Sequence, residues 1–196
     1  MVLNALMQKY GTDKGTPGNG YALFYESLFG ATRLSTRSVL EIGIHKGASL
    51  LVWREWFPLA QIVGVDCNPV SIQDYGERII ALHGNVRDPA FLTDLATRYM
   101  ELDIVIDDGS HQFADQLPAF NALFPCVSPG GWYIIEDAFL TTRHNGETGK
   151  IFYAMCDITR DANRYCQSVF PANCHPHAKD IFSVTFFDSL IAIQKR

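Results

Sequence analysis

The sequence has few cysteines, and none of them forms a C-x-x-C pair. The five are Cys67, Cys126, Cys156, Cys166 and Cys174. This odd, scattered set predicts reduced and mostly buried thiols, and it excludes a disulfide framework of the kind found in small secreted proteins. The segment "NCHPH" places Cys174 near His175 and His177. Because no second ligand pair stands at zinc-finger spacing, we interpret it as a surface loop.

Positive charge and long apolar runs are also scarce. The formal net charge is −5, which disfavours a nucleic-acid partner held through its phosphates. No apolar run approaches the roughly 20 residues that a bilayer-spanning helix needs. The N-terminus "MVLNALMQKYGTDKG" lacks the basic, apolar and small-residue regions of a signal peptide. We therefore expect a cytoplasmic globular protein without a membrane or nucleic-acid partner.

Short apolar segments alternate with segments of helical length along the 196 residues. The pattern predicts strands over 38–44, 61–66, 78–84, 102–107 and 131–137, and helices over 48–57, 70–76, 89–99 and 113–124. The end "IFSVTFFDSLIAIQKR" adds two alternating runs around Asp188 and Ser189, which predicts a hairpin. We therefore expect one α/β domain over 1–196, with a Rossmann-like, doubly wound, mostly parallel seven-stranded sheet and a C-terminal antiparallel hairpin.

The segments outside this core are less regular. Residues 138–150 are polar and predict a loop, which carries His144 as a second candidate base or, more simply, a surface residue. Tyr21 to Phe29 predicts an amphipathic helix after the Gly-rich 9–20, so that 1–30 forms an N-terminal helical lid or oligomerisation segment. Within it, Leu3, Leu6 and Met7 are candidates for packing against another subunit. Trp53, Trp56 and Phe57 follow helical spacing and predict core packing.

Polar residues and glycines follow the first three predicted strands. In an open α/β sheet, ligands bind beyond the carboxyl ends of the strands. The first strand ends in "EIGIHKGAS", from which we assign Glu41, Gly43, Gly47 and Ser49 to cofactor binding. A dinucleotide fingerprint would need a second glycine where His45 stands, which disfavours NAD.

The ends of the second and third strands complete the predicted cofactor site. Asp66 ends the second strand, where an acid accepts hydrogen bonds from a ribose diol or caps the next helix. Asn85 and Val86, with Asp88, follow the third strand at the place for an adenine edge. Glycine loop, ribose acid and adenine segment in this order predict an adenosine cofactor.

At this point the chain resembles the class I S-adenosylmethionine-dependent methyltransferases, and more closely the small metal-dependent sugar O-methyltransferases of macrolide biosynthesis, of the mycinamicin and demethylmacrocin type. The residues that carry the resemblance are "KYGTDKG", "LEIGIHKGASLLVWREWFPLAQIVGVD", "DIVIDDGSH", "PGGWYIIED" and "SVTFFDSLIAIQK". The resemblance implies S-adenosyl-L-methionine as methyl donor and a sugar or glycoside hydroxyl as small-molecule acceptor. The chain is shorter than the larger relatives, and Asn85 stands where many methyltransferases have an acid.

Methyl transfer to a sugar hydroxyl needs an aligned oxygen and a group that removes its proton. A divalent cation helps because it stabilises the forming alkoxide, and Mg²⁺ suits an oxygen-rich site. The fourth and fifth strands are expected to be neighbours, so acids at their ends can converge on one cation. By resemblance, Asp108, Glu136 and Asp137 hold the metal and His111 is the general base. Asp107 is assigned to the cofactor's amino-acid moiety or to backbone amides.

Other interpretations remain open at this stage. A catechol-like aromatic acceptor would use the same cofactor and metal, with the resemblance extending to the catechol-type methyltransferases. An NAD-linked oxidoreductase is disfavoured by the missing fingerprint. A cofactor-binding protein without catalysis would use the acids only as helix caps. The segment "GTDKG" (11–15) either closes over the methionine end of the cofactor or forms a disordered terminus.

Overall fold

The computed structural model describes residues 2–138, 149–162, 167–168, 172 and 174–196. The chain divides into two compact units, Met1–Asn85 and Val86–Arg196. Among the described helices, none combines the length and the apolar character that crossing a bilayer requires. That residues 1–196 act as one domain, with 1–30 as a lid, stays a prediction.

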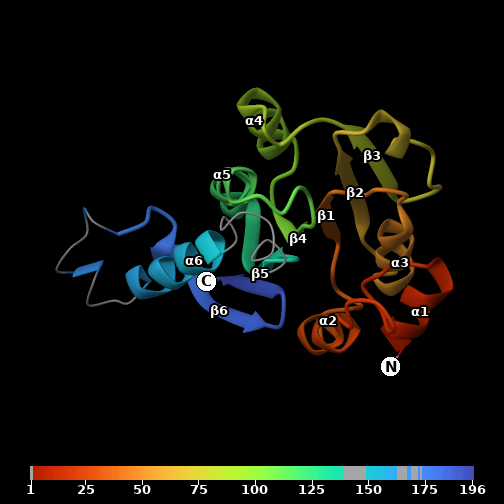
Figure 1. Cartoon of the computed structure of the whole chain (residues 1–196), viewed down its shortest axis with the longest axis horizontal. Coiled ribbons are helices and arrows are strands. Elements are labelled where there is room, and N and C mark those ends of the chain that lie inside the picture. Colours follow the sequence, from red (N-terminus) through yellow and green to blue (C-terminus); the bar gives the residue numbers. More distant parts are fainter. Residues whose placement is uncertain (1, 139–148, 163–166, 169–171, 173) are drawn as a thin grey trace. The chain divides into compact units, whose positions relative to one another are not determined.

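The first unit is built on three parallel strands in the order β3-β2-β1 (Figure 1). These are β1 (Ser38–Ile42), β2 (Gln61–Asp66) and β3 (Ile79–His83), and helix α3 (Ala48–Trp56) connects β1 to β2. Leu40 lies opposite Val63, and Val63 opposite Ile80. All three strands fall within the predicted ranges. The apolar residues of β1 and β2 are buried, whereas those of β3 are half-buried.

The N-terminal segment folds onto this unit. Helices α1 (Val2–Tyr10) and α2 (Ala22–Phe29) are in contact with each other, and α1 also contacts α3. Leu3 and Met7 are fully buried inside the chain, so the prediction that they pack against another subunit is wrong. Leu6 is half-buried. The α1 residues were assigned to a partner because their apolar side chains had no visible partner in the sequence.

The Gly-rich connection between α1 and α2 is ordered. The Tyr21 amide donates to the Lys14 carbonyl at 2.8 Å, and the Thr16 amide donates to Asn4 Oδ1 at 2.9 Å. A Cβ on Gly15 would lie 2.9 Å from the Met7 Cβ, so this glycine allows the connection to lie close against α1. The alternative of a disordered terminus is therefore wrong.

Aromatic side chains fill the space between α2 and α3. Tyr25 packs edge-on against Trp53 with ring centroids 5.1 Å apart, and Phe29 lies 5.8 Å from Phe57. Trp53, Trp56 and Phe57 are all buried, which confirms that their helical spacing marks core positions.

The helix predicted over 70–76 is not formed. Only a single 3₁₀ turn, η1 (Pro69–Ser71), is present, and the chain then runs irregularly into β3. Gly76 has φ +88° and its amide donates to Asp74 Oδ1 at 2.8 Å, a local turn that competes with helix formation. The Tyr75 hydroxyl donates to the Ser71 carbonyl at 2.8 Å, which connects the two ends of the irregular stretch 71–75.

The second unit has four strands in the order β4-β5-β7-β6. Strands β4 (Leu102–Asp107) and β5 (Val127–Ile135) are parallel, while β7 (Leu190–Lys195) pairs antiparallel with both β5 and β6 (Ile181–Phe187). The β6–β7 turn is at Asp188 and Ser189, with Asp188 at φ +44°, which confirms the predicted hairpin. The C-terminal strand β7 is thus inserted between β5 and the edge strand β6.

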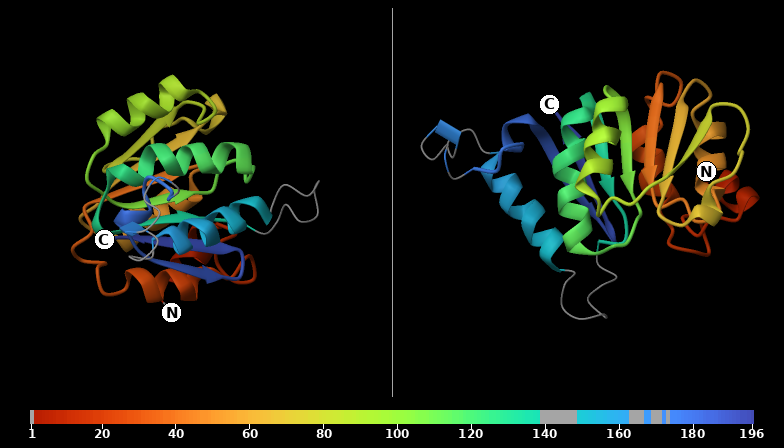
Figure 2. Two further views of the ribbon diagram at one scale, coloured as in Figure 1. Left: turned by 90° about the vertical axis from the view of Figure 1, so that its left-hand side faces the viewer. Right: turned by 90° about the horizontal axis from the view of Figure 1, so that it is seen from above.

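Three helices lie side by side in this unit. They are α4 (Pro89–Arg98), α5 (Phe113–Leu123) and α6 (Gly149–Asp161), with α5 in contact with both of the others (Figure 2). Helix α6 is absent from the sequence-based prediction, although Ile151, Met155 and Ile158 show helical spacing and are buried. Residues 139–148, most of the predicted 138–150 loop, and with them His144, lie outside the described residues.

The burial of α1 gives a direct test of how the N-terminal segment is held. We expect Met7→Ala to lower the free energy of unfolding by about 2–4 kcal/mol, because it leaves a cavity against α3 and the connection. Val2→Ala is the matched control, since Val2 is 58% exposed on the same helix. Denaturant unfolding followed by circular dichroism measures both; equal stability of the two variants would contradict the packing of α1.

Candidate functional site

The loop after β1 turns sharply on two glycines. Gly43 has φ +84° and Gly47 has φ +74°, backbone conformations that other residues adopt only at a cost. A Cβ on Gly47 would lie 2.1 Å from the Tyr75 ring, so a side chain at this position would clash as well. Gly47 therefore allows Tyr75 to pack closely against the loop, and the contact of Gly43 and Gly47 with a cofactor stays a prediction.

Glu41, at the end of β1, belongs to a buried group of charges. Its Oε2 accepts a hydrogen bond from Ser49 Oγ at 2.7 Å, and its Oε1 lies 3.7 Å from Lys14 Nζ. The Lys14 side chain is 2% exposed and that of Glu41 is not exposed at all. Two of the predicted cofactor residues, Glu41 and Ser49, are thus bonded to each other and to the "GTDKG" segment. Their direct contact with a cofactor stays a prediction.

Asp66 organises the same loop from the end of β2. Its Oδ2 accepts hydrogen bonds from the amides of Ile44 at 3.0 Å and His45 at 2.9 Å, and its Oδ1 accepts from the Asn68 amide at 2.7 Å. The side chain thus connects the β1 loop with the start of η1. A ribose contact for Asp66 stays a prediction.

The segment after β3 lies where the sequence predicts it. Asn85 is exposed and Val86 is half-buried. Asp88 is the N-cap of α4, where its Oδ1 accepts from the Ala90 amide at 2.9 Å. These side chains lie at the carboxyl end of β3, but nothing in the contacts of Asn85 and Val86 tests the adenine assignment.

The end of β4 carries the two adjacent carboxylates, and they lie in different surroundings. Asp107 is 2% exposed. It accepts a hydrogen bond from the Gly109 amide at 3.3 Å and from the Tyr133 hydroxyl at 3.4 Å. Burial, with a smaller contribution from the neighbouring Asp108 charge, raises the pKa of Asp107 to about 7. Asp108 is half-buried.

Asp108, His111 and Asp137 come together beyond the ends of β4 and β5. Each offers one ligand atom, and these atoms lie within 4.8 Å of one another. Glu136 does not belong to this group, and it is 1% exposed. The structure thus brings three of the four residues of the predicted metal and base site together. The Glu136 assignment, like the individual roles of the other three, stays a prediction.

His111 is held in a constrained position. Its φ is +57°, a left-handed conformation that costs about 1–2 kcal/mol for a residue other than glycine, and Asp137 has φ +51°. The His111 Nε2 atom lies 3.8 Å from Asp137 Oδ2, while Nδ1 is buried without a hydrogen-bond partner. The two carboxylates are oxygen ligands of the kind that a divalent cation takes. The imidazole, with its unsatisfied nitrogen, is a group that can accept a proton.

A family model described as a methyltransferase domain matches residues 40–138. The chain belongs to this methyltransferase domain family. The matched range begins within β1 and ends just after Asp137, so it contains all of the residues assigned to the cofactor, the metal and the base.

Two curated relatives of this methyltransferase domain are named as O-methyltransferases. It is 41% identical over 142 residues to the demethylmacrocin O-methyltransferase of Streptomyces fradiae, a match that covers 69% of the chain and 36% of the relative. It is 41% identical over 142 residues to the mycinamicin VI 2''-O-methyltransferase of Micromonospora griseorubida, covering 69% and 35%. The chain thus spans about a third of the length of these relatives.

Solved structures confirm the fold of the methyltransferase domain. The MycE methyltransferase of the mycinamycin biosynthetic pathway, in complex with Mg and SAH, matches with a TM-score of 0.80 at 29% identity, over 98% of this chain and 54% of that chain. Its complex with Mg, SAH and mycinamycin VI matches with the same TM-score over 98% and 53%. The predicted Rossmann-like α/β fold, with seven mostly parallel strands and a C-terminal antiparallel hairpin, is confirmed.

Several residues near the sites were not found from the sequence. Lys14 was noted only as part of "GTDKG", and an isolated lysine gives no sign that it will be buried. Asp115 accepts hydrogen bonds from Arg87 and Ser110. An acid in the first turn of the helix after "DGSH" is a local signal that could have drawn attention to it.

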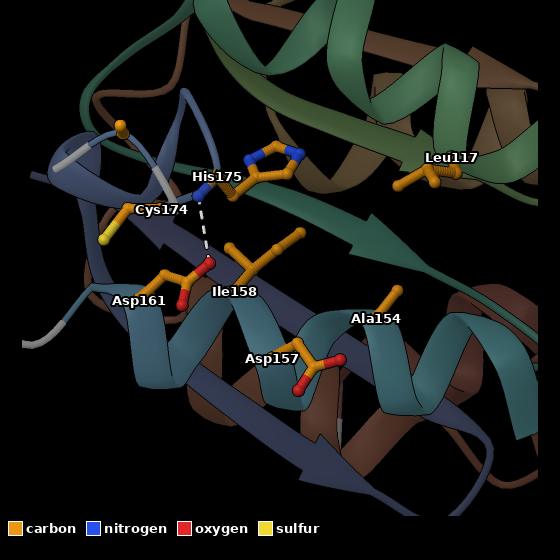
Figure 3. Close-up of a pocket in the computed structure, with 8 residues that line it drawn as sticks. Leu117, Ala154, Asp157, Ile158, Asp161, Cys174 and His175 are labelled. Atoms are coloured by element: carbon orange, nitrogen blue, oxygen red, sulfur yellow. Dashed lines mark hydrogen bonds between the residues drawn. The ribbon is translucent and has the colours of Figure 1, made fainter. Parts of the chain in front are cut away.

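A separate hollow of about 340 Å³ lies between α5, α6 and the chain before β6 (Figure 3). Its lining contains none of the predicted site residues; it consists of Leu117, Ala154, Asp157, Ile158, Asp161, Ala172, Cys174 and His175. The His175 amide donates to Asp161 Oδ2 at 2.9 Å. The rings of His175 and His177 each lie 6.2 Å from that of Phe120, so these two half-buried histidines pack on α5.

The raised pKa of Asp107 predicts how stability depends on pH. In the unfolded chain an aspartate titrates near 3.9. Because burial favours the protonated carboxyl of Asp107 in the folded chain, the free energy of unfolding falls as the pH rises from about 4 to about 7. We expect Asp107→Asn, which resembles the protonated form, to remove a pH dependence of up to about 4 kcal/mol between pH 4 and 8. Thermal unfolding of metal-free protein across this range measures the effect, and a decline as steep as in the wild type would contradict it.

The buried Lys14–Glu41 pair predicts strong coupling between the N-terminal segment and the β1 loop. Lys14→Met and Glu41→Gln should each destabilise the fold by about 3–5 kcal/mol, because each leaves a buried charge without its partner. The double variant should be less destabilised than the sum of the two, as a double-mutant cycle in urea will show. Lys9→Met is the control, because Lys9 forms an exposed ion pair with Glu55. Strict additivity of the Lys14 and Glu41 effects would argue against the pair.

Proposed function

We propose that the chain is an S-adenosylmethionine- and Mg²⁺-dependent O-methyltransferase that transfers a methyl group to a sugar hydroxyl of a glycosylated natural product. The observation that carries this proposal is the group of Asp108, His111 and Asp137 beyond the ends of two neighbouring parallel strands. In this group two carboxylates lie beside a proton acceptor. Methyl transfer to a weakly acidic hydroxyl requires such an acceptor.

His111 is the general base in this proposal. In its neutral form one ring nitrogen accepts the hydroxyl proton as the oxygen attacks the methyl carbon, the carbon–sulfur bond breaks and its electron pair stays on sulfur. Asp137, 3.8 Å from Nε2, favours the imidazolium that forms. The left-handed backbone at His111 sets the direction in which its side chain leaves the turn.

Asp108 and Asp137 would hold the cation, with His111 beside it. When bound, Mg²⁺ supplies positive charge that stabilises the developing alkoxide and orients the acceptor. Oxygen donors from carboxylates are the ligands that Mg²⁺ prefers, and the ion usually keeps several waters, so two carboxylates are a sufficient protein contribution. Glu136 would complete the acidic pair after β5, as the resemblance implies.

The acceptor class is supported by the relatives. The O-methyltransferases of S. fradiae and M. griseorubida are named for demethylmacrocin and mycinamicin VI, and a relative in Streptomyces olivaceus, 39% identical over 142 residues, is named for a rhamnosyl tetracenomycin. MycE is bound to Mg, SAH and mycinamycin VI. We therefore expect a sugar attached to a larger polyketide to be a better acceptor than a free sugar.

Two assays test the proposal. Calorimetry compares S-adenosylmethionine with NAD; we expect binding of the former alone, and binding of NAD alone would support the oxidoreductase. Methyl transfer from labelled S-adenosylmethionine is then measured with glycosylated macrolides, free sugars and a catechol, each with Mg²⁺ or EDTA. Transfer to the glycosylated macrolide that EDTA abolishes is the expected result, whereas transfer to the catechol alone would favour an aromatic acceptor.

Variants of the central residues separate their roles. His111→Ala should retain S-adenosylmethionine and Mg²⁺ binding but lower kcat by about 10²–10⁴, because it removes the general base. Asp108→Asn should lose Mg²⁺ binding together with turnover. Asp94→Asn, an exposed change in α4, is the control. Full activity of His111→Ala would exclude His111 as the base, and unchanged Mg²⁺ affinity of Asp108→Asn would exclude Asp108 as a ligand.

A further inference from the structure

Asp115 is a buried carboxylate at the start of α5 that contacts two other segments of its unit. It accepts hydrogen bonds from Arg87 Nε at 2.8 and 3.0 Å and from the Ser110 hydroxyl. We propose that Asp115, acting through Ser110, is a positioning residue that fixes the turn carrying Asp108 and His111. The proposal rests on the proposed function for the roles of those two residues.

Ser110 transmits this contact to the turn. Its Oγ donates to Asp115 and accepts from the Gln112 amide at 3.3 Å, and its carbonyl accepts from Gln112 Nε2 at 3.4 Å. His111 lies between these two residues in the sequence, in its left-handed backbone conformation. The Ser110 hydroxyl therefore connects the residues before and after His111 and holds them against Asp115.

Arg87 gives the same carboxylate a second connection. Arg87 directly follows Val86, in the segment assigned to the adenine edge, and its side chain is 61% exposed while that of Asp115 is 9% exposed. An Nε contact to both carboxylate oxygens fixes the orientation of Asp115 and leaves it positioned toward Ser110. The segment after β3 and the turn after β4 are thus held by one side chain.

A purely structural role for Asp115 makes a different prediction. An acid in the first turn of a helix stabilises the helix through its dipole and would affect only the stability of the fold. Replacement of a positioning residue must also change the cation affinity of the turn and the turnover rate. Cation affinity and kcat are therefore the measurements that distinguish the two.

The experiment uses Ser110→Ala, Ser110→Thr and Asp115→Asn in the full chain. Mn²⁺ binding to each is measured by electron paramagnetic resonance, alongside thermal unfolding and methyl transfer. We expect Ser110→Ala and Asp115→Asn each to weaken Mn²⁺ binding by roughly tenfold and to lower kcat more than they change KM, as partners of ligand segments do. Ser110→Thr keeps the hydroxyl and should recover most of both.

The double variant and a control complete the test. Ser110→Ala combined with Asp115→Asn should weaken Mn²⁺ binding no more than about as much as one change, because Ser110→Ala removes, and Asp115→Asn weakens, the same hydrogen bond. Asp94→Asn removes an exposed ion pair with Arg98 and should leave Mn²⁺ affinity unchanged. If Asp115→Asn fails to fold, the comparison of Ser110→Ala with Ser110→Thr decides, because Ser110 is exposed on the turn.

Wild-type Mn²⁺ affinity and kcat in Ser110→Ala and Asp115→Asn, with only the unfolding temperature lowered, would overturn the positioning role. Equal losses in Ser110→Ala and Ser110→Thr would overturn it as well. A wild-type chain that binds Mn²⁺ but transfers no methyl group would overturn the proposed function instead. Because affinity and transfer are separate assays, the two failures are distinguishable.

Discussion

The parallel pairing of β4 with β5 is the constraint on which the candidate site depends. Asp107 lies opposite Ile135, and the Glu136 amide donates to the Asp107 carbonyl at 2.9 Å. This register makes both strands end at one edge, so Asp108 and Asp137 leave the sheet next to each other. A slip by one residue would exchange the buried and the outward-facing side chains and separate the carboxylates.

The same pairing explains how two adjacent aspartates can share the end of β4. Asp107 is the last residue of β4 and is buried, whereas Asp108 follows the strand and is half-buried. Burial raises the pKa of Asp107 to about 7, and the Tyr133 hydroxyl from β5 donates to it. Near neutral pH a large part of Asp107 is therefore protonated, which lowers its repulsion of the Asp108 charge.

Buried charge is a feature of both units. In the first, Lys14 and Glu41 lie together beneath the β1 loop; in the second, Asp115 is buried beside the "DGSH" turn. Burying charges seldom adds stability, because desolvation offsets much of their attraction. Their benefit here is geometric, since each group connects segments far apart in the sequence: residue 14 with the end of β1, and residue 87 with the start of α5. The β1 loop and the "DGSH" turn are thus each held by a buried charged side chain.

The sequence by itself determined the order of the strands along the chain, the helices α3, α4 and α5, the C-terminal hairpin, and the placement of Asp66, Asp108 and Asp137 at or just after strand ends, because apolar periodicity and strand ends are local patterns. It could not determine that Leu3 and Met7 pack on their own chain, that 70–76 is irregular or that 149–161 is helical. Nor could it show that Lys14 reaches Glu41, or that Asp115 holds Ser110. These depend on which distant surfaces meet and on hydrogen bonds between remote side chains, and only the tertiary structure decides those contacts.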